Sequence, residues 1–379
     1  IRKLLFFTLF NDCNFMKSEE LSTFLNISGI PTTSFYEYKI SNFIQNELNQ
    51  MGLEFTIDEW GNIEIFIEGT SEEELVFISH MDHPGFELTE KISDSKYKAI
   101  PLGGLPKNCE NLSTPIIVFD NEKIVKGKIL KSSDSSIVED YRWLTKKEVI
   151  IEVNESIDLP APAVFDLPEP KISGNQVITP VADDLAGCSI ILETFKKLKN
   201  VKTKYSMRAI FTRAEEVGLV GARVIADSKR IKNDSIIVSI ETSSELPGAV
   251  SGLGPIIRAG DRISTFNNDG EIILLSAIQK IQETDKGFKF QRQLMNLGGC
   301  EASAFLPFGY RVTGITLPLI NWHNSTPDGN VEPERINILD YENAIKIMTN
   351  IGKLDIVEPE KYYKRLIDLP DEADRLKGN

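Results

Sequence analysis

Cysteine and histidine are scarce in this sequence, and each shortage narrows the chemistry that the chain can carry. Four cysteines and three histidines occur among 379 residues. The cysteines are scattered and form no C-x-x-C pair, which argues against a disulfide framework or a cysteine-rich zinc module and favours reduced thiols. We therefore expect a cytoplasmic protein.

Net positive charge and long apolar runs are also absent. The chain has 42 basic and 56 acidic residues and a formal net charge of −14, so it has little attraction for phosphate backbones or anionic lipid. No apolar run approaches the roughly 18 residues of a membrane-spanning helix, and the first residues make a poor signal peptide. We expect neither nucleic acid nor membrane as a partner, and residues 1–15 to be an extension ahead of the fold.

The N-terminal part of the chain predicts a helix followed by strands. Ser34 and Glu37 form a capping-box pattern, apolar residues then recur at helical spacing, and Gly52 supplies a stop. The next residues alternate across a Gly-Asn turn, as a hairpin does. A short apolar run, ELVFISH, then predicts a buried strand that ends at His80.

Strand and helix patterns alternate again in the second half. Helices are predicted to begin near Asp184, which we expect to cap the first of them, and at Asp340. Buried strands include IIVSIE and ITLPLI. Between the two parts lie short β-rich pieces separated by Gly, Pro, Asn and Ser, which are typical of a small all-β domain.

These patterns predict an α/β fold with a mostly parallel central sheet flanked by helices and an inserted, small, all-β barrel-like domain. The expected parts are a sheet domain of residues 16–85 and 168–355, an inserted β domain of residues 86–167, and a charged tail of residues 356–379.

Imidazoles and carboxylates gather where the predicted strands end or helices begin. Ligands of open α/β sheets bind at the carboxyl ends of strands. The candidate residues at these positions are His80, Asp183, Asp184, Glu215, Glu216, Glu241 and His323. Nitrogen and carboxylate ligands without a cysteine motif suit Zn²⁺, Co²⁺ or Mn²⁺, and the surplus of carboxylates over one tetrahedral shell indicates two metal ions that share a bridge.

Five motifs in a single order resemble those of the dinuclear zinc aminopeptidases, most closely the tetrahedral-particle glutamyl and deblocking aminopeptidases. The motifs are SHMDHPGF, VADDLAGC, FTRAEEVGLVGA, VSIETSSELPG and INWHNSTPD. The resemblance runs over most of residues 17–352. It implies a metal-dependent aminopeptidase that acts on short peptides. The enzyme would bind two divalent ions, with zinc favoured over cobalt or manganese, and would form a homo-oligomer through the β insert.

The resemblance also implies a role for each candidate residue. Asp82 would orient the imidazole of His80, and Glu215 would act as the general base that takes a proton from the attacking water. The metal ligands would be His80, Asp183, Glu216, Glu241 and His323, with Asp183 as the bridge.

Several positions depart from the family pattern. Leu185 stands where the family has arginine, and Cys300-Glu301 replaces its threonine-aspartate pair. Glu241 stands where aminopeptidases favour aspartate, whereas carboxypeptidase and deacylase relatives often carry glutamate. A deacylase or carboxypeptidase-like hydrolase therefore stays an alternative, as does a degenerate relative that binds peptides without catalysis.

Two further interpretations concern single residues. His83 falls where the family has an acid, and we expect it to be structural or solvent-facing, with contact to substrate or metal as the less favoured alternative. Cys300 is expected to be a buried, inert thiol. A glycosidase that uses Glu215 and Glu216 would have no need of the histidines, and it is disfavoured for that reason.

Overall fold

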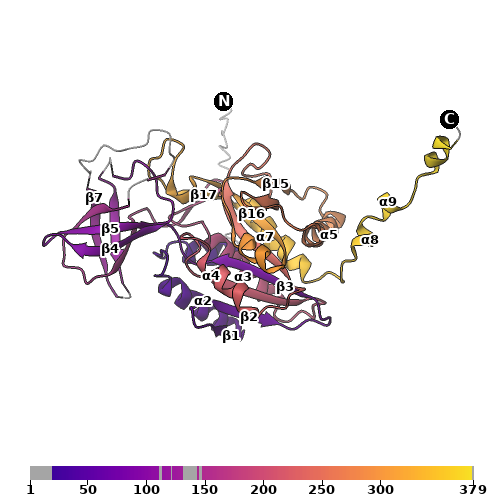
Figure 1. The fold of residues 1–379 in the computed structure, drawn as a ribbon, viewed down its shortest axis with the longest axis horizontal. Helices are drawn as coiled ribbons and strands as arrows, with labels where there is room; N and C mark the ends of the chain where they lie inside the picture. The colour runs from indigo at the N-terminus through magenta and orange to yellow at the C-terminus, as the bar shows by residue number, and fades with distance from the viewer. Residues whose placement is uncertain (1–18, 111–112, 121, 131–142, 145–146, 378–379) are drawn as a thin grey trace, which may run out of the picture.

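The computed structural model describes residues 19–377 except 111–112, 121, 131–142 and 145–146. A body of helices and strands and a separate barrel make up this part of the chain (Figure 1). The first described helix is α1 (Glu19–Ile27). The predicted extension of residues 1–15 lies outside the described residues.

An eleven-stranded mixed sheet forms the centre of the body, with its main strands in the order β1-β2-β12-β3-β13-β16-β17-β11-β10. Central strands β12, β3, β13 and β16 run parallel, and antiparallel pairs border them. The strands are β1 (Phe55–Ile57), β2 (Ile63–Ile67), β3 (Glu74–His80), β10 (Lys171–Ser173), β11 (Gln176–Thr179), β12 (Ser206–Thr212), β13 (Ile236–Ser244), β14 (Ile256–Asp261), β15 (Gln291–Met295), β16 (Arg311–Ile320) and β17 (Glu334–Asn337).

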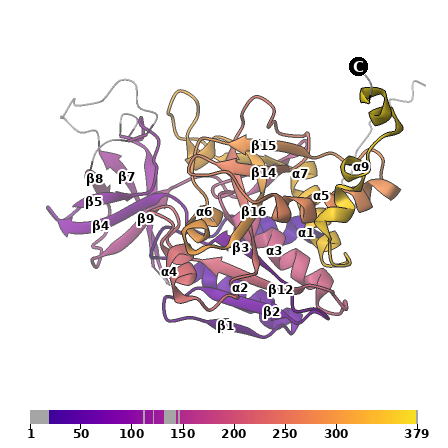
Figure 2. The same ribbon diagram turned by 45° about the vertical axis from the view of Figure 1, so that its right-hand side comes forward.

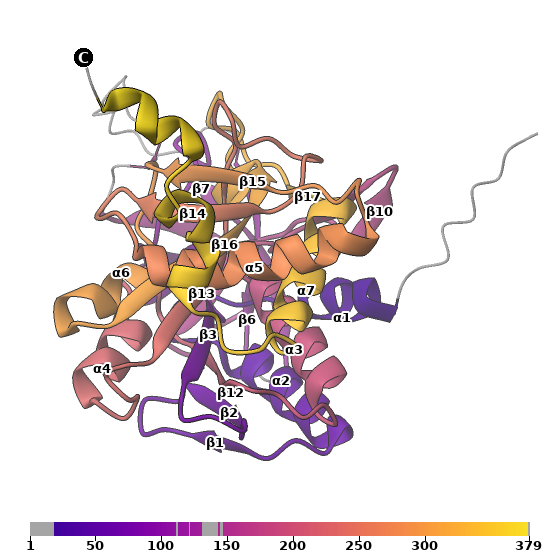
Figure 3. The same ribbon diagram turned by 90° about the vertical axis from the view of Figure 1, so that its right-hand side faces the viewer.

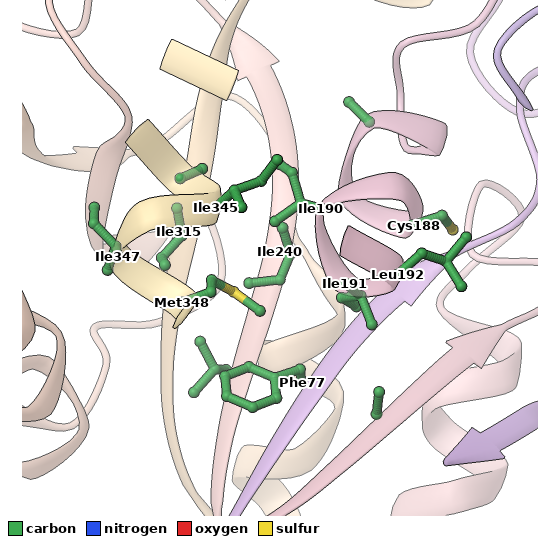
Figure 4. Close-up of a cluster of buried hydrophobic side chains, with 14 of the residues drawn as sticks. Phe77, Cys188, Ile190, Ile191, Leu192, Ile240, Ile315, Ile345, Ile347 and Met348 are labelled. Atoms are coloured by element: carbon green, nitrogen blue, oxygen red, sulfur yellow. The ribbon is translucent and has the colours of Figure 1, made fainter. Parts of the chain in front are cut away.

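Helices cover both faces of this sheet (Figure 3). One face carries α1, α2 (Tyr38–Met51), α3 (Leu185–Leu198), α5 (Asn268–Thr284) and α7 (Ile338–Ile351), and the other carries α4 (Val220–Ser228) and α6 (Glu301–Phe305). Because both faces are covered, every residue of β3 is buried. Figure 4 shows Phe77 and Ile240 of the sheet packed with Ile190 and Met348 of the helices.

Six antiparallel strands close into the barrel in the order β4-β5-β8-β7-β6-β9. They are β4 (Gly85–Lys91), β5 (Lys96–Leu102), β6 (Pro115–Phe119), β7 (Ile124–Leu130), β8 (Val149–Val153) and β9 (Ala161–Phe165). The barrel has an apolar core of its own, which includes Phe86, Tyr97 and Ile151, and it stands beside the body (Figure 2). The predicted fold class, a helix-flanked sheet with a barrel-like insert, is thus confirmed. The sheet is mixed rather than mostly parallel, because antiparallel pairs join its outer strands on both sides of the parallel centre.

The predicted capping box at the start of α2 is wrong. The helix ends at Gly52, in the left-handed conformation as expected, but its N-cap is Glu37, whose side chain makes no capping hydrogen bond. Ser34 lies three residues before that cap and donates instead to the carboxylate of Asp82 at 2.6 Å. Glu37 accepts from the guanidinium of Arg213 at 2.7 Å, so both polar residues serve long-range contacts rather than the helix end.

The predicted start of α7 at Asp340 is also wrong. Asn337 caps this helix by accepting a hydrogen bond from the backbone N–H of Leu339 at 2.9 Å. Asp340 lies inside the first turn, where it accepts from the backbone N–H groups of Gly252 and Gly254. A distant loop thus engages the carboxylate that sequence reasoning assigned to the helix end.

The C-terminal segment extends away from the body (Figure 1). It holds the short helices α8 (Pro359–Tyr362) and α9 (Lys364–Ile367) and a 3-10 turn, Asp371–Leu376, and none of their residues is buried. Across the described residues, no helix has both the length and the apolar character needed to cross a membrane.

Candidate metal centre

The carboxyl ends of the central strands meet at one edge of the sheet. β12 pairs in parallel with β3 so that Thr212 lies beside His80, and both strands end there. A cavity of about 740 Å³ opens at this edge, a size typical of small-ligand sites. Its lining includes His80, Asp183, Glu215, Glu216, Glu241 and His323. The structure therefore brings the predicted ligands and the predicted base together.

Glu241 lies inside its strand rather than at the end. β13 continues to Ser244 and stays paired with β16, but its pairing with β3 stops where Ser239 lies beside Ile78. Beyond that point the edge facing β3 is open, so the carboxylate of Glu241 reaches to 3.9 Å from Nε2 of His80. Divergence of two neighbouring strands gives this residue access to the cavity.

Asp183 stands between the two imidazoles. Its Oδ1 lies 3.5 Å from Nε2 of His80, and its Oδ2 lies 3.4 Å from Nε2 of His323. The indole N–H of Trp322 also donates to Oδ2. The neighbouring Asp184 caps α3, as predicted, by accepting from the backbone N–H of Gly187. Of the two adjacent aspartates, Asp184 thus caps the start of α3 and Asp183 faces the cavity.

Glu216 and His323 both stand on turns. Glu216 lies between β12 and α4, and His323 lies just beyond β16 in a left-handed backbone conformation with φ of 56°. Oε1 of Glu216 is 3.2 Å from Nε2 of His323. We call this pair the loop half of the site, and the pair of His80 and Glu241, carried by β3 and β13, the strand half.

Asp82 connects His80 to the turn that holds Glu215 and Glu216. Its carboxylate accepts from the backbone N–H of Glu215 at 2.9 Å and from that of Glu216 at 3.1 Å. Nδ1 of His80 lies 3.1 Å from the carbonyl oxygen of Asp82 and 3.5 Å from its Oδ1. The main contact with the imidazole is therefore made by the carbonyl group, while the carboxylate fixes the glutamate turn.

Both histidines turn Nε2 toward the cavity. Nδ1 of His80 faces the carbonyl oxygen of Asp82, and Nδ1 of His323 faces that of Gly104, each at 3.1 Å. Because a carbonyl oxygen can only accept, Nδ1 must carry a proton in each ring, and Nε2 is the atom left to bind a metal. Metal-binding histidines are typically fixed in this way by a backbone carbonyl.

The electrostatics of the cavity show a surplus of buried negative charge. Burial, and then repulsion from Glu216 and Glu241, raises the pKa of Glu215 well above its usual range. Burial likewise raises the pKa of Glu241 to about 7. Burial alone would lower the pKa of His323, but the carboxylates of Glu216 and Asp183 raise it to about 10. Cations placed among these groups would relieve the repulsion.

The residues present fit metal ions. Oδ1 of Asp183 and Oε1 of Glu216 are buried and accept no hydrogen bond in the described part of the chain, and each faces a histidine Nε2 instead. Such oxygens normally find a partner, because a buried carboxylate without one is costly. Ligand atoms of His80, Asp183 and Glu216 lie within 4.8 Å of one another, as do those of His80, Glu215 and Glu241. Imidazole and carboxylate donors of this kind suit Zn²⁺, Co²⁺ or Mn²⁺.

Comparison with known proteins identifies the family. The family described as M42 glutamyl aminopeptidase matches residues 61–347. The chain belongs to this family. It is accordingly a metal-dependent aminopeptidase, a hydrolase of peptide bonds, which confirms the activity predicted from the motifs.

Relatives of the family cover nearly the whole chain. A protein of Acetivibrio thermocellus with a provisional aminopeptidase name is 25% identical over 88% of this chain and 98% of its own length. The solved TET1 peptidase of Pyrococcus horikoshii is 22% identical with a TM-score of 0.74, covering 88% of this chain and 99% of its own. An aminopeptidase of Desulfurococcus kamchatkensis is 21% identical with a TM-score of 0.72, covering 88% and 95%. These solved structures share the fold.

Sequence reasoning missed several residues of the cavity of this M42 family member, among them a buried arginine. Arg258 of β14 is 2% exposed and lines the cavity. Its guanidinium makes only long contacts, 3.5 Å to Oγ1 of Thr316 and 3.4 Å to the carbonyl of Gly298, and its Nε has no partner among the described residues. An arginine inside the apolar run GPIIRAG was the available signal.

The departures from the family pattern lie beside the site. Glu301 opens α6, its backbone N–H donates to Glu241 at 3.3 Å, and burial raises its pKa to about 8. Cys300 is fully buried, and burial raises the pKa of its thiol, as expected of an inert cysteine. His83 is buried rather than solvent-facing, with Nδ1 2.7 Å from the carbonyl of Asp183 and Nε2 3.0 Å from Oδ1 of Asn324.

Proposed function

We propose that this aminopeptidase uses two divalent metal ions to hydrolyse N-terminal residues from short peptides. Zinc is the ion that we favour. The strand half would hold one ion and the loop half the other, with Asp183 as the shared ligand. The position of Asp183 carries this proposal, because each of its two carboxylate oxygens faces a different imidazole within 3.5 Å. A carboxylate so placed is suited to bridge two cations.

Metal ions in these positions would polarise the scissile carbonyl and make a bound water acidic near neutral pH. Glu215 is the proposed general base. Its carboxylate lines the cavity, remains 12% exposed, and lies 3.8 Å from Nε2 of His80. It would take a proton from the attacking water and deliver it to the leaving amine. Asp82 holds the backbone of Glu215 and so fixes where that proton is received.

We further propose a preference for acidic N-terminal residues. The family description names glutamyl aminopeptidases, and Arg258 places a buried cation with an unpartnered Nε on the cavity wall. A substrate carboxylate would supply the missing partner, and charge-assisted pairs of this kind are strong. Neutral and basic side chains would leave that Nε without a partner.

The catalytic proposal is tested with Glu215→Gln beside the exposed control Glu283→Gln. We expect the first to lower kcat by about 10²- to 10⁴-fold, the range of general-base catalysis, while it retains both metal ions. The control is expected to match the unaltered enzyme. Unchanged hydrolysis by Glu215→Gln would refute the assignment of the base.

Chelation followed by metal reconstitution tests the metals. We expect activity on aminoacyl p-nitroanilides to vanish and to return with about two equivalents of Zn²⁺ or Co²⁺. Turnover of N-acyl substrates in place of those with a free amine would favour the deacylase or carboxypeptidase-like alternative. Peptide binding without any turnover would favour the non-catalytic one.

Arg258→Met tests the substrate preference. We expect the ratio of kcat/KM for glutamyl over leucyl p-nitroanilide to fall by about 10²-fold, because truncating one partner of a buried charge pair is costly. Loss of both activities in equal measure would contradict a role in selectivity.

Assembly and location complete the proposal. The TET1 peptidase of Pyrococcus horikoshii can assemble into a tetrahedron or a large octahedral shell, which supports a homo-oligomer here. The barrel is the proposed contact region. Light scattering on the purified chain tests this, and a monomer at micromolar concentration would contradict it. Location in the cytoplasm stays a prediction.

A further inference from the structure

The barrel contacts the candidate metal centre through a turn that directly follows β5. Gly103 and Gly104 form this turn, and the carbonyl of Gly104 accepts the Nδ1–H of His323 at 3.1 Å. The imidazole is a proposed ligand of the loop half, yet the group that fixes its tautomer belongs to the inserted barrel region. Outer partners of this kind orient metal-binding histidines.

The same turn packs closely against both residues of the loop half. A Cβ on Gly104 would lie 3.1 Å from Nδ1 of His323, and a Cβ on Gly103 would lie 3.1 Å from Cβ of Glu216. Contacts this close leave little room for any side chain, so glycine is needed for the approach. Gly103 also has a φ of 85°, which favours glycine on backbone grounds.

An aromatic contact from the same region reinforces the turn. The ring of Trp143 lies 5.2 Å from that of His323 and 5.4 Å from that of Trp322. Trp143 is tied to the turn, because it forms an isolated β-bridge with Pro106 and the next residue, Leu144, donates to the carbonyl of Leu105 at 2.8 Å. Turn and tryptophan therefore act as one unit against the imidazole.

The segment that follows His323 is fastened to the barrel region as well. The backbone N–H of Asn108 donates to the carbonyl of Gly329 at 3.0 Å, and its side chain donates to the carbonyl of Asp328 at 2.9 Å. The strand half is held differently, since the side chains of His80 and Glu241 bond to Asp82, Ser239 and Glu301, which all lie outside the barrel strands.

We propose that the Gly103–Gly104 turn and Trp143 are positioning elements for the loop half, so that contact with the inserted barrel sets the affinity of one of the two metal ions. The inference rests on the proposed two-metal site. It gives the barrel a part in the chemistry of the sheet domain, through the tautomer and orientation of His323.

The test compares Gly104→Ala with Gly287→Ala. Gly104 has no left-handed φ, so alanine is compatible with its backbone, and only the added methyl disturbs His323. Gly287 is the matched control, because its Cβ would meet only Oδ1 of Asp285 at 3.5 Å. Each purified chain is freed of metal and titrated with Co²⁺, and calorimetry and visible absorption report the two binding steps.

We expect Gly104→Ala to bind one ion as the unaltered chain does and the second about 10- to 100-fold more weakly. The melting temperature of the metal-free chain should stay unchanged, and Gly287→Ala should match the unaltered chain throughout. Two binding steps of normal affinity, or equal weakening of both, would overturn the inference and leave the proposed function intact. An unaltered chain that binds fewer than two ions would overturn both, before any variant is compared.

Trp143→Ala and Trp143→Phe provide a second route should Gly104→Ala melt early. We expect the alanine variant to weaken the second ion only, and the phenylalanine variant to restore most of its affinity, because an aromatic ring again packs on His323. Equal affinities in both variants and the unaltered chain would then overturn the inference.

Discussion

His80 and Glu241 stand on neighbouring strands of the sheet, whereas Glu216 and His323 stand on turns that the barrel region touches. The strand pair is placed by β3 and β13, whose backbones are paired with other strands and buried on both faces. The turn pair depends on contacts from Gly104 and Trp143, which are distant in sequence, and from Glu334, which is eleven residues away from His323.

Because the two halves are held differently, we expect them to respond differently to metal removal and to substitution. A strand in a covered sheet moves little, because its ladder and its packing must break together. Turns have fewer constraints and rely on specific hydrogen bonds. We expect the strand half to hold its geometry without metal, and the loop half to be the more sensitive to substitution.

Removal of a proposed ligand imidazole from either half should have the largest effect. We expect His80→Ala and His323→Ala each to lower kcat/KM by about 10³-fold or more, because a metal ion supplies several kcal/mol of transition-state stabilisation. His323→Ala should keep one tightly bound ion in the strand half, measured by metal analysis after dialysis. Retention of both ions by His323→Ala would show that the loop half does not hold an ion of its own.

Loss of the Glu334 carboxylate should have the next largest effect. It accepts from the backbone N–H groups of Ala182, Asp183 and His323, so it supports both the proposed shared ligand and the loop half. We expect Glu334→Ala to lower the free energy of unfolding of the metal-free chain by about 3–5 kcal/mol, since three buried donors lose their acceptor. Denaturant titration measures this, with exposed Glu332→Ala as the control. Equal stability of the two variants would contradict it.

The affinity for metal ions should depend on pH, because each half of the site contains a histidine with a raised pKa. Neighbouring carboxylates outweigh burial and raise the pKa of His323 to about 10 and that of His80 well above its usual 6.5. His323 is then protonated in the metal-free chain at neutral pH, and an arriving ion must displace that proton. Affinity should therefore fall as the pH falls from 10.

The raised histidine pKa values also determine how the stability of the metal-free fold changes with pH. A raised histidine pKa stabilises the metal-free fold fully below pH 6.5, and this contribution is lost as the pH rises through about 10. Calorimetry in buffers of different ionisation enthalpy measures the protons released on metal binding. Release of none would contradict the protonated state of His323.

Ser34→Ala should have the smallest effect. Its hydroxyl donates to Asp82, which in turn contacts His80 and the glutamate turn. We expect a loss of about 1 kcal/mol of stability and about tenfold in kcat/KM, with both metal ions retained. Ser41→Ala, in the nearby helix α2, is the control. A loss as large as that of His80→Ala would place Ser34 far closer to the chemistry than its contacts do.

Sequence patterns predicted most of the fold because the periodicities are local. The buried strand ending at His80, the stop at Gly52 and the cap at Asp184 all follow from neighbours within a few residues. The caps assigned to Ser34 and Asp340 failed for the opposite reason. Each residue has a partner more than forty positions away, which no local pattern encodes.

By itself the sequence determined the fold class, the family motifs and the set of residues that meet at the edge of the sheet, because periodicity and strand ends are local properties. Only the tertiary structure decided that Asp183 lies between two imidazoles, that Arg258 enters the cavity, and that the carbonyl of Gly104 fixes His323. These depend on strands and turns that meet only when the chain is folded. Two of the three histidines line the cavity, and in the folded chain a backbone carbonyl fixes the tautomer of each.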